Sequence, residues 1–282
     1  MLTYGAELWG LNKATILEQN QTSFLRSILG TDKNTSAPAV RAELGMHSLQ
    51  SNLIIKVFNY WLKILFMDTN SLPKICLMEQ TNMALTNSWI SRLHETITHH
   101  GFSIQYLLSI APQARDIFKQ RVLDISAQSD LELLSKNRSL SWLAKNKITF
   151  LPEKYISMPL PQVLRRAFTR ARFELLDSMV KYGRFHHLPY QERTCICGSP
   201  SVENISHILF DCQLYAPIRL EYLSPFLERT VHRDPIHRLS YLLSGSNVYI
   251  VRKVAKFVTK AAALRTQYVE QIGVSCKGDL HI

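Results

Sequence analysis

A mainly α-helical fold is predicted by three features of this 282-residue chain. Hydrophobic residues make up 46% of the sequence, which is enough to bury the core of one or two domains. Glycine occurs only ten times. Apolar residues recur at the three- and four-residue spacing of amphipathic helices, and one such face is Ile16, Phe24, Leu25, Ile28 and Leu29. We therefore expect a globular helical protein and not a disordered tail.

Interruptions of this helical pattern divide the chain into four consecutive segments. Glycine, proline and polar residues gather at 30–38, 70–73, 152–161 and around Pro235. The segments predicted from these breaks are 1–70, 71–160, 161–235 and 236–282.

No membrane span is predicted. The most apolar stretch, 53–67, is interrupted by Lys56 and Lys63 and is shorter than the roughly twenty residues that a span needs, so we interpret it as a buried amphipathic helix. Residues 1–10 lack the basic and apolar regions of a secretory signal. We expect a reducing, intracellular environment, nuclear or cytoplasmic, in which disulfides do not form.

Four potential metal ligands fall within eighteen residues, and they are Cys195, Cys197, His207 and Cys212. Their spacing is Cys-x-Cys-x9-His-x4-Cys. Three thiolates and one neutral imidazole match the preferences of zinc and complete a tetrahedral site. A site filled by four protein ligands leaves no position for an activated water. The cofactor predicted here is therefore structural zinc.

The ligand spacing also predicts local structure. Residues five apart on a helix point about 140° away from each other, so a helix that carries His207 must end before Cys212. We expect a short helix over about 202–210. Ser199 or Ser201 can cap this helix, Pro200 suits its first turn, and Glu203 favours the positive end of its dipole.

Other interpretations of these residues stay open. Free cysteines often pack as small hydrophobic side chains, and Cys-x-Cys is a tighter pair than the usual Cys-x2-Cys. A Cys–His pair can also form a nucleophilic dyad, although no orienting third group is evident. If His207 is dispensable, His186 and His187 are the substitute ligands.

The charge of the chain indicates an anionic partner. The formal net charge is +11. Residues 1–150 contain 15 Lys and Arg against 11 Asp and Glu, a net of +4, whereas residues 151–282 contain 18 against 11, a net of +7. The excess therefore lies mainly in the half with the four metal ligands.

Two basic helices account for much of this excess. Apolar residues repeat at helical spacing over 164–179 and 251–268, and cations occupy the remaining surface. The residues predicted to contact nucleic-acid phosphates are Arg165, Arg166, Arg170, Arg172, Arg252, Lys253, Lys256 and Lys260. The alternative is that each helix simply exposes a solvated basic face.

Several short segments resemble the carboxyl-terminal part of reverse transcriptases from non-LTR retrotransposons, the long interspersed elements. The order of these segments along the chain and the distances between them match as well. The first group is LTYGAELWG at 2–10, FLRSILG at 24–30 and RAELG at 41–45. The second group is LRRAFTRAR at 164–172, RTCICG at 193–198 and HILFDCQLY at 207–215. The resemblance implies a helical thumb-like region over 1–70, a linker region over 71–160, and a zinc knuckle that serves RNA and target DNA.

The resemblance does not imply polymerase activity for this chain. The family's metal-binding carboxylates lie in an Asp-Asp motif upstream of the Tyr-Gly segment, and this sequence has no Asp-Asp dipeptide. Asp130 and Glu132 are the nearest acidic pair, and we expect them on a solvated loop or helix face. Because Met1 lies next to the Tyr-Gly segment, we interpret the chain as a truncated reading frame.

These observations predict a non-catalytic protein that binds RNA, DNA or both through phosphate contacts. One alternative is an inert or protein-interacting helical relic of a truncated element. Another is a thumb that complements an upstream reverse transcriptase core supplied in trans.

Overall fold

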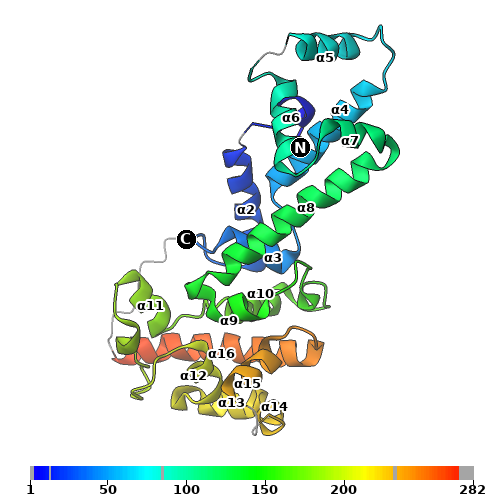
Figure 1. The fold of residues 1–282 in the computed structure, drawn as a ribbon. Helices are drawn as coiled ribbons and strands as arrows, with labels where there is room; N and C mark the ends of the chain where they lie inside the picture. Colours follow the sequence, from blue (N-terminus) through cyan, green and yellow to red (C-terminus); the bar gives the residue numbers. More distant parts are fainter. Residues whose placement is uncertain (1–2, 13, 84–85, 231–233, 273–282) are drawn as a thin grey trace. The chain divides into compact units, whose positions relative to one another are not determined.

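The chain is mainly α-helical, as its sequence predicts. A computed structural model describes residues 3–12, 14–83, 86–230 and 234–272, and within these ranges it contains sixteen α-helices and four short 3-10 helices (Figure 1). The β-pairing in the same ranges is one isolated antiparallel bridge between Thr194 and Val202. None of the described helices combines the length and the apolar character that crossing a bilayer requires. Position 2 of the LTYGAELWG segment and the predicted segment beyond residue 272 lie outside the described residues.

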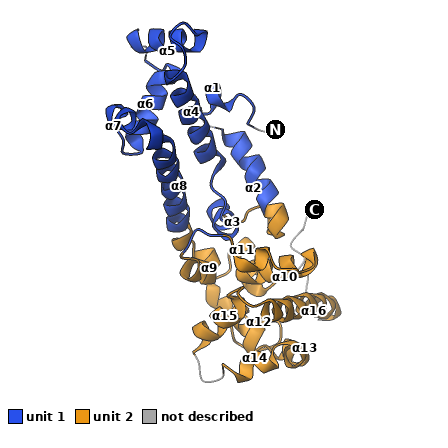
Figure 2. Ribbon diagram, turned by 90° about the vertical axis from the view of Figure 1, so that its right-hand side faces the viewer, with its two compact units in different colours: residues 1–25, 37–133, 149–151 blue, residues 26–36, 134–148, 152–282 orange. Residues whose placement is uncertain are grey.

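The described residues form two compact units that are interleaved in sequence (Figure 2). Unit 1 comprises residues within 1–25, 37–133 and 149–151, and unit 2 comprises those within 26–36, 134–148 and 152–282. This division differs from the four consecutive segments. The reason is tertiary packing, because helices from 161–235 and from 236–272 pack on one another in unit 2.

Unit 1 is built around a long buried helix, α4 (Leu49–Leu65), which confirms the amphipathic helix predicted there. Ser48 caps its start by accepting a hydrogen bond from the Ser51 N–H. The Phe58 ring of α4 stacks on Phe118 at a centroid distance of 3.9 Å, and both side chains are fully buried. The other helices are α1 (Ala6–Trp9), α2 (Thr15–Leu29), α3 (Ala37–Leu44), α5 (Leu72–Asn82), α6 (Trp89–His99), α7 (Ile104–Ser109) and α8 (Ala111–Ser135). The last residues of α2, 26–29, and of α8, 134–135, belong to unit 2.

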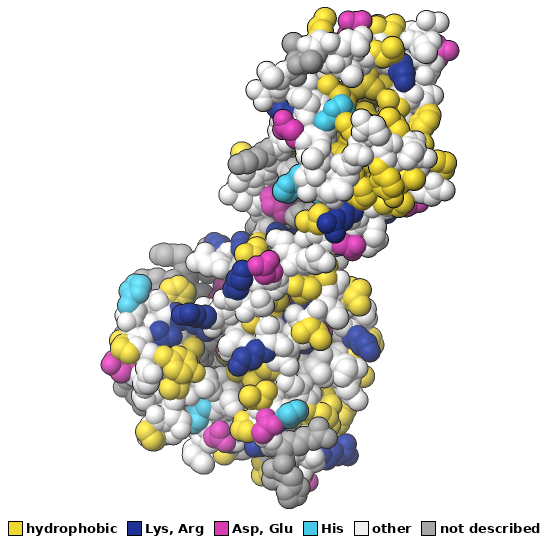
Figure 3. Space-filling model, viewed as in Figure 1, with side chains coloured by type: hydrophobic (Ala, Val, Ile, Leu, Met, Phe, Trp, Pro, Cys, Tyr) yellow, Lys and Arg dark blue, Asp and Glu magenta, His cyan; other side chains and the backbone are white. Residues whose placement is uncertain are grey.

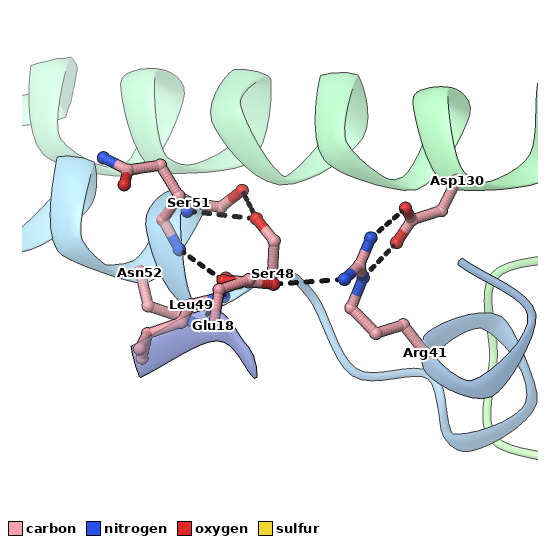
Figure 4. Close-up of polar contacts among 8 residues, drawn as sticks. Glu18, Arg41, Ser48, Leu49, Ser51, Asn52 and Asp130 are labelled. Carbon is pink, nitrogen blue, oxygen red and sulfur yellow. Dashed lines mark hydrogen bonds and ion pairs between the residues drawn. The ribbon is translucent and has the colours of Figure 1, made fainter. Parts of the chain in front are cut away.

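A buried ionic network ties α2, α3 and α8 to the start of α4 within unit 1 (Figure 4). The Arg41 guanidinium donates to both carboxylate oxygens of Asp130, at 2.8 and 2.6 Å, and to Glu18 at 3.1 Å. Glu18 also accepts a hydrogen bond from the Leu49 N–H at 2.8 Å. The expectation that Asp130 lies on a solvated face is wrong, because it is 4% exposed and pairs with Arg41. Its neighbour Glu132 is exposed.

Unit 2 holds both predicted basic helices. Helix α10 (Gln162–Arg172) packs along α16 (Val248–Ile272), and α13 (Ala216–Tyr222) and α15 (Pro235–Leu243) also pack on α16 (Figure 1). The remaining elements are η1 (Arg138–Leu140), α9 (Ser141–Asn146), η2 (Lys154–Ile156), α11 (Met179–Phe185), η3 (Tyr190–Glu192), α12 (Ile205–Phe210), η4 (Gln213–Tyr215) and α14 (Ser224–Glu228).

Helix α16 buries the apolar stripe that its sequence predicts. The buried members of the stripe are Val251, Val254, Val258 and Ala261. Phe257 is fully buried beside them and meets the Tyr215 ring edge-on at 6.4 Å. One side of α16 is therefore fixed in the core of unit 2, and the opposite side is left for polar residues.

The other predicted basic helix is shorter than its apolar repeat suggests. Helix α10 ends at Arg172, and Glu174 adopts a left-handed φ of 51°. The Ser178 hydroxyl then caps a new helix, α11, by accepting from the Lys181 N–H. Residues 164–179 therefore belong to two helices joined by a turn, because a left-handed residue and an N-cap cannot lie inside one continuous helix.

Candidate metal centre

The loop that carries the first two predicted ligands is closed by backbone hydrogen bonds. The Cys195 N–H donates to the Ser201 carbonyl at 3.0 Å, next to the isolated antiparallel bridge. Inside the loop, the Gly198 N–H donates to the Cys195 carbonyl at 3.2 Å. Gly198 adopts a φ of 86°, which only glycine reaches without strain. This tight turn follows Cys197 directly and lets the narrow Cys-x-Cys pair double back.

The third ligand lies on a short helix that ends before the fourth. The Asn204 side chain caps α12 by accepting from the His207 N–H at 2.9 Å, so the helix begins at Ile205 and not at the serines expected to cap it. After Phe210 the chain leaves the helix, and the Cys212 N–H donates to the His207 carbonyl at 2.8 Å. The helix end predicted between His207 and Cys212 is therefore confirmed.

The ligand atoms of Cys195, Cys197, His207 and Cys212, which we call the Cys/His group, all lie within 4.8 Å of one another. The Cys195 and Cys212 sulfurs are 3.6 Å apart, and the Cys197 sulfur lies 3.6 Å from Nε2 of His207. Zinc–sulfur bonds of about 2.3 Å in a tetrahedral site separate neighbouring sulfurs by about 3.8 Å. A disulfide would need about 2.05 Å. The group is therefore compatible with a four-coordinate metal site.

Protonation of the Cys/His group also favours a cation. Cys212 is fully buried, and the exposed fractions of Cys195 and His207 are 5% and 6%. The hydrogen bond between the two thiols raises the pKa of Cys195, whose burial adds to the shift, and lowers the pKa of Cys212. Of the two thiols, Cys212 is therefore the one that loses its proton more readily. A divalent metal would replace the proton that Cys195 holds beside it.

An arginine supports the carboxyl-terminal end of the ligand helix. The Arg219 guanidinium of α13 donates to the carbonyls of Leu209 at 2.9 Å and Cys212 at 2.7 Å. Three thiolates, a neutral imidazole and a divalent cation would carry a net charge of −1. Arg219 lies where its positive charge offsets both that charge and the negative end of the helix dipole.

The ligand loop is also anchored by a buried carboxylate. Glu203 was expected to favour the first turn of the ligand helix, but it precedes the Asn204 cap and is fully buried. It accepts a hydrogen bond from the Met179 N–H at 2.6 Å and pairs with Arg265 of α16. Burial raises the pKa of Glu203 to about 7, against the opposing charge of Arg265. The loop is therefore joined to α11 and α16 in the core of unit 2.

The alternative roles of these residues gain less support. Cys197 and His207 form a close pair, but no third group among the described residues hydrogen-bonds Nδ1 of His207, so a nucleophilic triad is incomplete there. The substitute ligands His186 and His187 are not part of the Cys/His group, whose histidine is His207. The ring of His186 instead stacks on Tyr182 at 4.0 Å.

One of the arginines predicted to contact phosphate, Arg172, lies in the interior of unit 2. Arg172 is 3% exposed and pairs with Glu153 at 3.2 Å. Its guanidinium carbon also lies 5.0 Å from the Trp142 ring centroid and 5.3 Å from that of Tyr155. These partners account for its charge, so Arg172 cannot serve as a surface contact for phosphate in this conformation.

The other three arginines of α10 are half-buried, and each donates a hydrogen bond to a backbone carbonyl. The acceptors of Arg165, Arg166 and Arg170 are the carbonyls of Met158 at 3.0 Å, Ser27 at 2.8 Å and Leu175 at 2.8 Å. Arg170 also pairs with Asp32 at 3.3 Å. These side chains therefore stabilise unit 2, and their contact with phosphate stays a prediction.

The cations of α16 are much freer. Arg252, Lys256 and Lys260, which we call the basic row, are exposed and have no hydrogen-bond or ion-pair partner among the described residues. The remaining predicted contact, Lys253, is half-buried between the rings of Tyr222 and Tyr249. On the face of unit 2 drawn in Figure 3, Lys and Arg side chains are dispersed and do not form one continuous patch. The regular spacing of the basic row is thus its distinguishing feature.

No family model, curated protein or solved structure matches the chain. The function is therefore inferred from the site itself. Of the residues that support the metal ligands, Asn204 could have been predicted from the sequence as the cap of α12, because a polar residue directly before an apolar run is a helix-start signal. Arg219 and Arg265 gave no such signal, because their partners lie elsewhere in the chain.

Proposed function

We propose that this chain is a non-catalytic nucleic-acid-binding protein and that its Cys/His group holds structural zinc. The observation that carries the proposal is the basic row on α16. A helix buried along one side presents three cations at four-residue intervals on the other, and no acidic residue occurs from 252 to 265. Phosphates are the natural partners of such a row, because guanidinium and ammonium groups bind them through charge-assisted hydrogen bonds and release counterions.

Zinc fits the donor set of the proposed metal site. Three sulfurs and one imidazole nitrogen suit its softness, and they would leave no coordination position for water. Its role would be to stabilise the fold of the ligand loop and α12. Because Glu203 joins that loop to Arg265 on α16, the metal would also support the helix that carries the basic row.

The resemblance to the carboxyl-terminal part of non-LTR retrotransposon reverse transcriptases supports RNA or DNA as the partner. In that interpretation the chain corresponds to the nucleic-acid-binding region that follows the polymerase core in that family. The resemblance rests on short segments of sequence. The charge pattern of α16 supports nucleic-acid binding independently of it.

We expect no polymerase activity from the chain by itself. Two-metal phosphoryl transfer needs paired carboxylates that are free to bind metal, and Asp130, of the nearest acidic pair, is committed to Arg41. Primer extension on an RNA template tests this expectation. Nucleotide incorporation that copurifies with the wild-type protein through successive columns would contradict it.

The basic row is tested by replacing two of its members, Lys256→Ala and Lys260→Ala, in one variant. Single-stranded RNA affinity should fall for all sequences alike, and the log–log salt dependence should become shallower by about 1.4, or roughly 0.7 for each lost phosphate contact. Fluorescence anisotropy across a salt series measures both quantities.

A matched control for this variant lies on α8, where Arg115 and Lys119 are also exposed and four residues apart. The Arg115→Ala, Lys119→Ala protein should bind RNA as the wild type does. If the α16 variant retains wild-type affinity and slope, the basic row is only a solvated face.

A helical protein-interaction module is the second candidate function. The apolar face predicted on α2 is only partly covered, because Leu25 and Leu29 are buried but Ile16 is 73% and Phe24 66% exposed. Exposed apolar side chains of this size favour a protein partner. Salt-sensitive RNA binding separates the two candidates, because burial of these side chains would depend little on salt.

A further inference from the structure

An exposed tyrosine precedes the basic row on the same face of α16. Tyr249, Arg252, Lys256 and Lys260 follow one another at intervals of three, four and four residues. At 100° per residue their directions fall within about 80° of one another around the helix. Tyr249 is 55% exposed, and the row beyond it extends about 12 Å along the helix axis from Arg252 to Lys260. One face of α16 therefore begins with an aromatic ring and continues with cations.

Neighbouring helices hold this ring in place. The Phe226 ring of α14 meets Tyr249 edge-on at 5.7 Å. Lys253 lies between Tyr249 and Tyr222 of α13, with its Nζ 5.7 and 5.6 Å from the two ring centroids. Tyr249 is thus a positioned aromatic side chain that retains more than half of its surface free.

We propose that this face binds single-stranded nucleic acid, with a base stacked on Tyr249 and the following phosphates on the basic row. The proposal rests on the proposed function and narrows its ligand. In a duplex the faces of the bases are buried by stacking on one another. A duplex can therefore present phosphates to the basic row but no base face to Tyr249. A single strand offers both, and stacking on an aromatic ring accepts any base. The surface should therefore prefer single strands without reading their sequence.

The test compares full-length wild-type protein with the Tyr249→Leu variant, because leucine retains apolar bulk and helix propensity but has no aromatic face. The probe is a labelled oligoribonucleotide of mixed sequence, used alone and paired with its complement. The variant should bind the single strand about 5-fold or more weakly, the least that one stacked base contributes. Its affinity for the duplex and its salt slope should be unchanged. Tyr249→Phe should restore single-strand binding.

Tyr106 in unit 1 provides the matched control, because it is 48% exposed and also packs on one phenylalanine, Phe102, at 6.2 Å. Tyr106→Leu should leave both affinities at wild-type values. Equal single-strand affinity in Tyr249→Leu and wild type, or an equal loss in Tyr106→Leu, would overturn the stacking proposal and leave phosphate binding intact. Salt-independent binding, or none, by the wild type would overturn the proposed function as well. Thermal melts of each variant distinguish lost contacts from lost folding.

Discussion

Cys197→Ser should abolish stoichiometric zinc binding and lower the stability of unit 2. The substitution removes one of four ligands whose atoms lie within 4.8 Å of one another and leaves an incomplete donor set. Apparent folding free energies of structural zinc sites are on the order of 10 kcal/mol at neutral pH, so the expected effect exceeds that of an ordinary point substitution. Elemental analysis of protein purified under reducing conditions measures the metal. Thermal unfolding with and without a chelator measures its contribution to stability.

Cys76 provides the control for this experiment. It is a free, exposed cysteine on α5 of unit 1 and is not part of the Cys/His group. Cys76→Ser should retain one zinc per chain and the wild-type response to chelator. The assignment of the metal site is wrong if wild-type protein contains no zinc, or if Cys197→Ser still contains one equivalent.

The second large effect is expected in unit 1, where Asp130→Ala should lower the free energy of unfolding by about 3 to 5 kcal/mol. Burial disfavours the Arg41 charge, but the hydrogen bond and the charge of Asp130 outweigh burial and raise the pKa of Arg41. Removing Asp130 therefore leaves a buried cation whose remaining carboxylate partner is Glu18, a residue that is also bonded to the Leu49 N–H (Figure 4).

Urea unfolding followed by tryptophan fluorescence measures this change, because Trp9, Trp61 and Trp89 all belong to unit 1. Asp116→Ala on the exposed side of α8 is the control and should shift the midpoint little. Replacing Arg41 and Asp130 together with Met and Leu should recover much of the lost stability, because the carboxylate that remains, Glu18, is partly exposed and keeps its hydrogen bond from the Leu49 N–H. A single Asp130→Ala variant that unfolds like the wild type would show that the network contributes nothing.

Local patterns predicted much of this fold. The long helices α4 and α16 could be predicted from the spacing of their apolar residues. Apolar residues three and four positions apart lie on the same face of a helix, and that face is the one that becomes buried. The ligand set and the helix end between His207 and Cys212 follow from spacing as well, because two ligands five residues apart cannot reach one metal from a continuous helix. These predictions required no knowledge of which elements pack together.

The remaining features depend on partners that are distant in sequence. Asp130 is 89 positions from Arg41, and Glu203 is 62 positions from Arg265, so nothing near either carboxylate indicates that it is buried. Arg172 has the same helical spacing as a surface arginine, and only packing against Glu153 and two aromatic rings shows that it lies inside. A periodic pattern shows which residues share a face of a helix. It does not show whether another element covers that face.

The salt dependence of wild-type affinity for single-stranded RNA tests the central claim most directly. If the three cations of the basic row, Arg252, Lys256 and Lys260, each neutralise one phosphate, the logarithm of the association constant should fall with the logarithm of salt concentration at a slope of about 2. Zinc-loaded protein should show this slope on unrelated sequences. Binding that is absent at low salt, or that does not weaken as salt is added, would contradict a nucleic-acid-binding role for this chain.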